Sequence, residues 1–317
     1  MLMILRVAIA FVLLSGSLDA ASAPPVYVFT DKELAQCTRM RTPNLIHNPK
    51  TGSIHMAVRC CGKNRCSSAP GETDGLRDNL KDCKVGLKSS RDGGRTWGGW
   101  QIVSGSEPGY GHGSPLWDST RERIVLQYQS FLSGGGTTKP TPNTSYYQLT
   151  SEDDAKTWSA PRDITHFFAS AQKSPDDMMD ITAGNKVETP TGRLLWLAHD
   201  HSKNVISWFS DDGGATFNVS RNKVRGNEVS VAVRDPQSGH LLMDGRGQSF
   251  PWFPRRAMYH STDDGTTWSE PVESPLLDPP DGGCQRALIS HQGVLYTVRT
   301  TKPHFRCPGQ AQACGSP

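Results

Sequence analysis

The stretch Ser90-Arg91-Asp92-Gly93-Gly94-Arg95-Thr96-Trp97 recurs along the chain and decides the fold. Related copies begin at Ser151, Ser210 and Ser261, so successive copies start 61, 59 and 51 residues apart. The copy at Ser151 has Ala155 where the other copies have glycine. In this pattern Asp and Ser side chains can bond the turn's own backbone, Gly can adopt positive φ, and the final Trp or Phe can pack as an anchor. The repeat is therefore a structural device and not a catalytic one.

This spacing is typical of propeller blades, each a four-stranded antiparallel sheet of roughly 40 to 50 residues plus loop insertions. Partly alternating apolar stretches before and between the copies predict strands, and no stretch shows a long helical period. The predicted strands cover residues 84–88, 123–128, 193–198, 204–209, 229–233 and 240–243. The sequence thus predicts one all-β domain.

Composition agrees with a folded β domain. Among 317 residues there are 31 Gly and 22 Pro, which indicates many turns and argues against a helical bundle. Hydrophobic residues make up 35% and charged residues 21%, enough apolar surface for a core. The net charge of +3 is too close to balance to favour a nucleic-acid or membrane-surface partner.

The first residues have the pattern of a secretory signal. Arg6 precedes an apolar run from Val7 to Leu14, and small residues follow as far as Ala23. We therefore expect a signal peptide over residues 1–23, a mature domain over 24–317 without a membrane span, and a secreted or secretory-pathway location. Sequons at Asn143 and Asn218 agree with glycosylation in that compartment.

Eight cysteines in an exported chain favour disulfides. Five lie between Cys37 and Cys83 and three between Cys284 and Cys314, so one bridge must cross between the groups if all of them pair. The rival interpretation is a zinc site in the run Cys60 to Cys66, but that run lacks a second pair with the required spacing. We expect neither a metal nor a cofactor.

Four further segments, together with the repeats, resemble the sialidase (neuraminidase) family. The segments are Arg39–Ile46, Gly226–Val233, Met243–Gly247 and Gly283–Ile289. The family's repeats are known as Asp boxes. The resemblance implies a six-bladed β-propeller, here lacking part of its last blade.

The resemblance also implies residue roles. Arg41, Arg246 and Arg306 would grip the carboxylate of a sialic acid, with Arg299 as the less favoured third arginine. Planar guanidinium groups suit this task because they form paired, charge-assisted hydrogen bonds with a carboxylate. Asp78 would be the acid/base, with Asp74 and Asp82 as rivals, and Glu228 would polarise the nucleophile.

The implied activity is that of an exo-α-sialidase, which hydrolyses terminal α-linked sialic acids from glycoproteins, glycolipids or oligosaccharides with retention. Because the anomeric carbon of a sialic acid already bears a carboxylate, sialidases use a tyrosine nucleophile. That tyrosine should follow the third arginine by a few dozen residues, yet the chain stops at Pro317. We therefore expect a C-terminally incomplete chain with low activity.

Two alternatives remain at this point. One is an Asp-box propeller that binds glycans or proteins without hydrolysis, and the other is a glycoside hydrolase for a different sugar, without an arginine cluster.

The run His199-Asp200-His201 is interpreted as a hydrogen-bonded or solvated strand end in preference to a metal pair. Trp252 and Phe253 either wall a sugar pocket or pack against neighbours. The glycine-rich stretch 133–138 is expected to be an insertion and not a phosphate loop.

Overall fold

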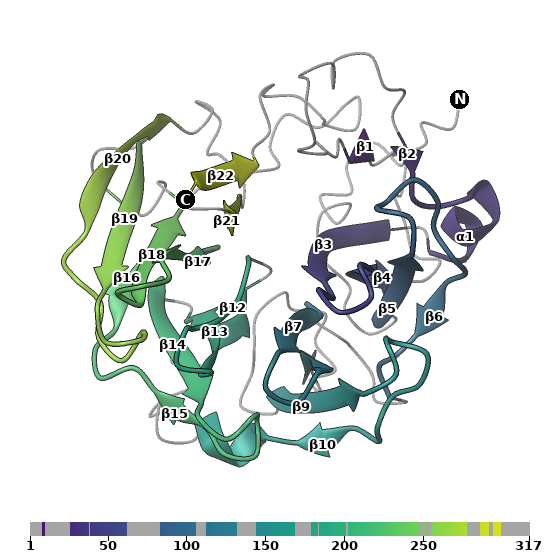
Figure 1. The fold of residues 1–317 in the computed structure, drawn as a ribbon, viewed down its shortest axis with the longest axis horizontal. Helices are drawn as coiled ribbons and strands as arrows, with labels where there is room; N and C mark the ends of the chain where they lie inside the picture. Colours follow the sequence, from purple (N-terminus) through teal and green to yellow (C-terminus); the bar gives the residue numbers. More distant parts are fainter. Residues whose placement is uncertain are drawn as a thin grey trace, which may run out of the picture.

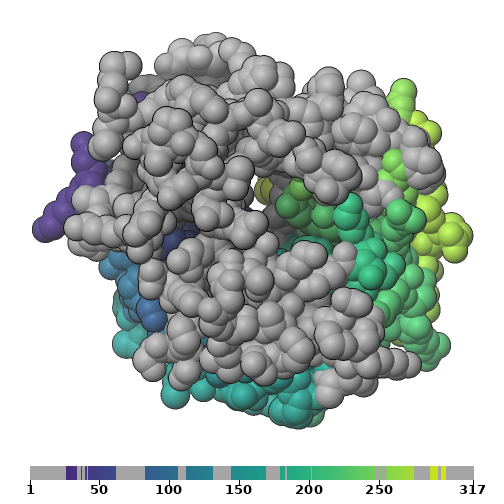
Figure 2. All heavy atoms as spheres, turned by 180° about the vertical axis from the view of Figure 1, so that it is seen from behind, coloured from purple at the N-terminus to yellow at the C-terminus, as the bar shows by residue number. Residues whose placement is uncertain are grey.

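The computed structural model describes residues 8–9, 26–37, 39–61, 83–105, 112–131, 144–168, 179–182, 184–200, 202–246, 250, 255–277, 286–291 and 294–298. Their strands form antiparallel sheets arranged around a common centre (Figure 1). Seen from the opposite side, the molecule has a hollow near its middle (Figure 2). The described residues form an all-β, propeller-like fold.

Four sheets have the form of blades, numbered here in chain order. Blade 1 consists of β3 (Arg39–His47), β4 (Ile54–Cys61), β5 (Cys83–Ser90) and β6 (Gln101–Ile102). Blade 2 consists of β7 (Ser114–Asp118), β8 (Arg123–Phe131), β9 (Thr144–Ser151) and β10 (Arg162–Asp163).

Blade 3 has an interrupted first strand and an interrupted last strand. It consists of β11 (Asp180–Ile181), β12 (Val187–Glu188), β13 (Leu194–His199), β14 (Asn204–Ser210), β15 (Asn218–Val219) and β16 (Val224–Arg225). Blade 4 consists of β17 (Ser230–Asp235), β18 (His240–Gly245), β19 (Arg255–Ser261) and β20 (Val272–Leu277). A hairpin of β21 (Ala287–His291) and β22 (Val294–Val298) follows. All six strands predicted from the sequence are confirmed.

Outside the blades, β1 (Ala8–Ile9) pairs with β2 (Val26–Tyr27). The described residues also include the short helix α1 (Asp31–Gln36) and the 3-10 helix η3 (Thr165–Phe168). A capping box between Thr30 and Glu33 starts α1. The ammonium of Lys88, on β5, then pairs with Glu33 at 2.7 Å and anchors α1 to blade 1. No helix among the described residues is long and apolar enough to cross a membrane.

The direction of the strands defines two ends of the propeller. β3, β7, β12, β17 and β21 lie nearest the centre (Figure 1). In an antiparallel blade the first and third strands run the same way. The Asp boxes follow the third strands β5, β9, β14 and β19, so they lie at the end where the inner strands finish. We call this the Asp-box end and the other the entry end, where the inner strands begin.

The four Asp boxes share one hydrogen-bond pattern, which confirms their structural role. The serine Oγ of each accepts a backbone N–H from four residues further on, at 2.6 to 2.9 Å. The aspartate accepts both the N–H and the hydroxyl of the threonine, the latter at 2.6 Å in every copy. Ala155 adopts φ 63° where the other copies have glycine at positive φ.

The core lies between neighbouring blades. Buried side chains from blades 2 and 3 form one apolar cluster around Trp196 and Trp208, and those from blades 3 and 4 form another around Leu241 and Tyr259. The indole of Trp196 also donates to the carbonyl of Ser114 at 3.2 Å, from blade 3 to blade 2. Packing between sheets therefore fixes the positions of the inner strands.

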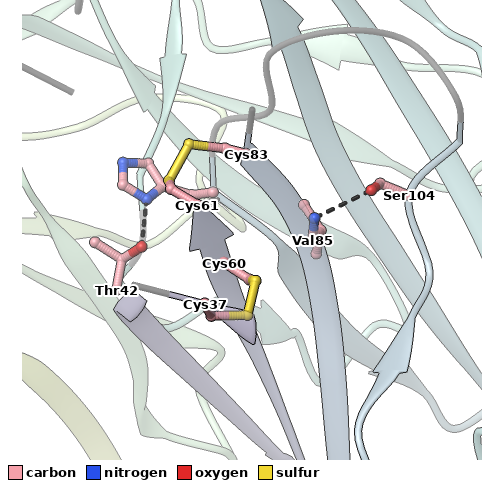
Figure 3. The surroundings of a disulfide bond; sticks show 8 residues. Cys37, Thr42, Cys60, Cys61, Cys83, Val85 and Ser104 are labelled. Atoms are coloured by element: carbon pink, nitrogen blue, oxygen red, sulfur yellow. Dashed lines mark hydrogen bonds between the residues drawn. A yellow bond between two sulfur atoms is a disulfide. The ribbon is translucent and has the colours of Figure 1, made fainter. Parts of the chain in front are cut away.

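Two disulfides in blade 1 confirm the expectation of disulfide bonding (Figure 3). Cys37 pairs with Cys60, and Cys61 pairs with Cys83. Both cysteines at the start of the rival zinc run are therefore oxidised and do not serve as zinc ligands. The remaining cysteines lie outside the described residues, so the bridge between the two groups stays a prediction; they are Cys66, Cys284, Cys307 and Cys314.

Candidate functional site

The structure brings two of the predicted site residues together at the entry end of blade 4. Glu228 lies just before β17 and Arg246 just after β18, and the register pairs Ser230 with Asp244. Nη1 of Arg246 donates to Oε2 of Glu228 at 2.9 Å. The Arg246 side chain is only 8% exposed, whereas that of Glu228 is 35% exposed. A buried guanidinium thus meets a carboxylate that remains open to solvent on one side.

Arg41 lies at the same end of the propeller, on the inner strand β3 of blade 1. It lies near the start of β3, where it pairs with Arg59 of β4. A register shift between Arg41 and Asn44 follows, and within it Thr42 adopts φ 56°. The Thr42 hydroxyl contacts Nδ1 of His112 at 2.7 Å. The backbone of Arg41 is thereby fixed, while its side chain lies outside the described part of the structure.

The connection that carries Asp78 starts and ends near Arg41. β4 ends at Cys61 and β5 begins at Cys83, and the disulfide between these two residues joins the ends of the connection. In the same sheet Cys61 lies opposite Arg39. The segment that contains Asp78 is therefore attached to blade 1 at the entry end. Asp78 and its rivals Asp74 and Asp82 lie outside the described residues, as do Trp252, Phe253, Arg299 and Arg306.

Asp180 is a site candidate that sequence reasoning missed. It opens β11 at the entry end, and its Oδ1 accepts from Nε2 of Gln129 at 2.6 Å. Gln129 is held in turn by the N–H of Ile181, which donates to its Oε1 at 2.7 Å. The only signal available in the sequence was an acidic residue directly before an apolar strand, which is a weak one.

The electrostatic surroundings of Asp180 connect several blades. Burial raises the pKa of the Asp180 carboxyl, while the charges of His199, on the paired strand, and Arg59, on blade 1, lower it. The negative charge of Glu228, beside blade 4, raises it further. The charges that act on this one carboxyl thus belong to residues of blades 1 and 3 and to Glu228 beside blade 4.

The run around His199 lies beside Asp180, because the register of β11 and β13 pairs Asp180 with His199. Asp200 accepts the backbone N–H of Asn204 at 2.8 Å and its side-chain amide at 3.0 Å, which agrees with the predicted hydrogen-bonded strand end. His201 lies outside the described residues. Among the residues that the structure describes, no group of three or more His, Cys, Asp or Glu side chains is arranged to hold a metal ion.

Comparison with known proteins defines the class. Residues 69–306 match the model of the BNR repeat-like domain family, and the chain belongs to this family. It is 26% identical over 225 residues to a sialidase of Paraclostridium sordellii, a match covering 65% of this chain and 54% of that protein. It is 28% identical over 233 residues to a sialidase of Bacteroides fragilis, covering 65% of this chain and 40% of that protein. The matches thus span about half the length of these curated relatives.

Solved structures show the same fold. The Hadza microbial sialidase Hz136 superposes with a TM-score of 0.64 at 23% identity, over 80% of this chain and 50% of that one. The intramolecular trans-sialidase of Ruminococcus gnavus superposes with a TM-score of 0.62 at 15% identity, over 84% of this chain and 76% of that one. The predicted resemblance to the sialidase family is confirmed at the level of family and fold.

Proposed function

We propose that this domain binds terminal α-linked sialic acids of glycoconjugates and hydrolyses them with retention, as an exo-α-sialidase. The observation that carries the proposal is the contact between Arg246 and Glu228 at the entry end, the end of the propeller at which β3 begins and Arg41 lies. The buried guanidinium suits the carboxylate of a sialic acid, and the partly exposed carboxylate beside it suits the reacting anomeric carbon. The sialidases among its relatives support the same substrate class.

In this proposal Arg41, Arg246 and Arg306 hold the substrate carboxylate. Guanidinium groups bind carboxylates with paired hydrogen bonds, and a site with little access to water strengthens them. Arg246 is already oriented by Glu228, so little side-chain entropy is lost when substrate binds. Lysine would be a poorer choice, because its ammonium cannot form the planar paired contact.

The chemical step uses the two acidic residues. Glu228 acts as the base that takes the phenolic proton of a tyrosine nucleophile, so that the phenolate attacks the anomeric carbon. Asp78 protonates the departing glycosidic oxygen, and later removes a proton from the water that releases the sugar. The negative charge of Glu228 in turn helps to raise the pKa of the Asp180 carboxyl.

The proposal includes the architecture around the site. The complete propeller has six blades, in which β21 and β22 begin the fifth. Residues 1–23 form a secretory signal and residues 24–317 belong to the propeller, which acts outside the cell or in the secretory pathway on glycoproteins, glycolipids or oligosaccharides. The disulfides of blade 1 support an oxidising compartment.

Calorimetric titration with an α-sialoside tests substrate recognition directly. R246M should weaken binding by about 30-fold or more, since truncating one partner of a buried charged contact costs 2 kcal/mol or more. R255M is the matched control, because Arg255 forms an ion pair with Glu273 at 2.7 Å at a half-exposed position on blade 4. An equal loss of sialoside affinity in R246M and R255M, or no sialoside binding by the unaltered chain, would contradict the proposal.

Hydrolysis of a fluorogenic α-sialoside separates an enzyme from a binding protein. Under the proposal E228Q lowers kcat strongly and leaves sialoside affinity within a few-fold of the unaltered chain. Binding without any turnover, unaffected by E228Q, would favour the non-catalytic alternative. An unaltered chain that hydrolyses a different glycoside and ignores sialosides would favour another glycoside hydrolase.

A further inference from the structure

A cavity lies between the inner strands of blades 1, 2 and 3, and neither Glu228 nor Arg246 lines it. It has a volume of about 270 Å³ and is lined by three inner strands and the residues beside them. The lining residues are Asn44, Leu45, Ile46, His47, Pro115, Leu116, Trp117, Asn185, Lys186 and Glu188. These lie in the later part of β3, in the middle of β7, and in β12 with the two residues before it, so the cavity is displaced toward the Asp-box end. We call it the axial cavity.

The axial cavity is large enough for a small organic molecule. A water molecule occupies about 30 Å³ of liquid, so the volume corresponds to about nine waters, or a ligand of on the order of ten non-hydrogen atoms. Its lining is mainly polar, and Pro115, Leu116 and Trp117 of β7 form an uncharged stretch on one side. An aromatic or aliphatic group would find contacts there.

Lys186 provides the positive group of the cavity. Its Nζ donates to Oδ1 of Asn44 at 3.2 Å, and Nδ2 of Asn44 donates to the carbonyl of Gly113 at 2.8 Å. A neutral amide thus holds the amine in place. Because an ammonium has three N–H donors, this contact leaves capacity for a ligand.

The other charged groups around the cavity do not pair with Lys186. Glu188 lies on the same inner strand, but both of its carboxylate oxygens accept the N–H of Ser119 at 3.1 Å. His47, from β3, is exposed. As a residue Lys186 is only half-buried, yet its amine lies deep enough for burial to lower its pKa well below the usual value. Among the residues that the structure describes, no carboxylate contacts this amine, although a buried lysine normally has such a partner.

We propose that the axial cavity is a second ligand site, which binds a small carboxylate with an aromatic or aliphatic tail. The carboxylate accepts from Nζ of Lys186, and the tail packs on Trp117 and Pro115. The site is separate from the sialic acid site, since neither Glu228 nor Arg246 lines it. It also holds if the proposed sialidase activity fails, because no residue of the axial cavity has a role in that chemistry.

Binding at this site must be linked to a proton. A carboxylate beside the amine favours the ammonium form, so the complex takes up a proton from solvent whenever the free amine is neutral. Affinity should therefore fall as pH rises, by up to about tenfold per pH unit. Measurements between pH 7.5 and 9 avoid the ordinary range of histidine, near 6.5, and so leave out titration of His47.

Calorimetric titration with benzoate, with neutral benzamide as the comparison ligand, tests the proposal. Benzoate should bind at least about tenfold more tightly than benzamide, with proton uptake measured from the dependence of the binding enthalpy on the buffer. K186M and K186Q should each remove that preference. K156M is the matched control, since Lys156 is an exposed lysine in the Asp box of blade 2. R246M should leave the benzoate site of Lys186 unaffected.

Several results would overturn the proposal. Equal affinity for benzoate and benzamide, or unchanged benzoate binding in both lysine variants, would show that the amine does not hold the carboxylate. Loss of benzoate binding in R246M alone would place the ligand in the sialic acid site instead. If benzoate still quenches tryptophan fluorescence in W117F, the ring of the ligand does not pack on Trp117.

Discussion

Two residues at the entry end adopt a backbone conformation that their side chains disfavour. Among the described non-glycine residues with positive φ, most belong to Asp boxes or hairpin turns. The exceptions are Thr42 at φ 56° and Glu228 at φ 46°. A β-branched residue in this region is a clear outlier, and such strain concentrates at functional sites. Both residues lie beside the arginines expected to bind substrate, which agrees with a site built there.

The conformation of Glu228 leads to a prediction about stability. E228N and E228Q both remove the negative charge beside Arg246, but asparagine tolerates the left-handed region better than glutamine does. E228N should therefore be more stable than E228Q by about 0.5 to 1 kcal/mol in urea unfolding. Glu188, which lies in β12 and is absent from the positive-φ residues, provides the control pair E188N and E188Q. A similar advantage for asparagine at both positions would count against backbone strain at Glu228.

The sequence predicted some site residues and missed others for physical reasons. Glu228 and Arg246 could be predicted because each lies in a recognisable local segment next to a strand. Asp180 and Arg59 could not, because their roles arise from contacts between blades that no local pattern records. Gln129 is an ordinary strand residue until its contact with Asp180 is seen.

At the scale of elements, the two disulfides of blade 1 close segments of similar length with different contents. The sequence separations are 23 for Cys37–Cys60 and 22 for Cys61–Cys83. The segment closed by the second bridge includes Asp78, the proposed acid/base. The bridge between Cys61 and Cys83 therefore holds both ends of that segment next to the start of β3.

Removing the bridges should separate stability from function. C37S/C60S and C61S/C83S should each lower the free energy of unfolding by about 3 kcal/mol, as chain entropy predicts for loops of this size. Only C61S/C83S should also lower kcat for a fluorogenic α-sialoside, because only that bridge fixes the ends of the Asp78 segment. Both variants should be assayed well below their unfolding temperatures, and circular dichroism should confirm that they are folded, so that kcat is compared between folded proteins. Equal effects on kcat would contradict the assigned role.

The glycines of the Asp boxes provide a prediction about the blades. Gly265 has φ 76°, and a Cβ built there would lie 2.1 Å from Cδ1 of Leu195 on blade 3. Gly52, in the turn between β3 and β4, is the comparison: it has φ 73°, but no atom lies within 4 Å of a Cβ built there. G52A should therefore cost about 1 kcal/mol from backbone strain alone, whereas G265A should cost at least about 1 kcal/mol more from overpacking. Equal costs in urea unfolding would show that the contact with Leu195 relaxes freely.

The elements that the sequence predicted are those with repeated signals. Alternating apolar residues and the Asp boxes located one or two strands in each blade, namely β5, β8, β13, β14, β17 and β18. The helix α1 was missed because a helix of six residues is too short to show periodicity, and a capping box and an ion pair to Lys88 stabilise it instead. The interrupted inner strand of blade 3 was missed because β11 and β12 are each only two residues long.

At the scale of the molecule, Asp boxes also join blades. The carboxylate of Asp154, in the Asp box of blade 2, accepts hydrogen bonds from Asn48 at 2.8 Å, from Ser53 at 2.8 Å and from Nε2 of His55 at 2.9 Å, all in blade 1. Arg91 pairs with the same carboxylate. Burial raises the pKa of Asp154, but these four contacts outweigh it and lower the pKa below its usual range.

Acid should weaken the propeller through these aspartates. Hydrogen bonds from Thr157 lower the pKa of Asp153 to about 2, and those from Thr96 lower that of Asp92 to about 2. The pKa of an aspartate in the unfolded chain is about 3.9. The contribution of Asp92 and Asp153 to the free energy of unfolding is therefore complete above that pH and is lost as pH falls toward 2. Urea unfolding between pH 5 and 2 should show this loss, with a smaller slope in D153N. An identical slope in D153N would contradict the assignment.

The central claim is that groups from separate blades meet at the entry end to hold one acidic sugar. A crystal structure of the chain with bound N-acetylneuraminic acid tests this most directly. The account predicts that the sugar carboxylate contacts the guanidinium groups of Arg41 and Arg246, with the anomeric carbon facing Glu228. Sugar density elsewhere on the molecule, or side chains of Arg41 and Arg246 that face away from each other with the sugar bound, would contradict it.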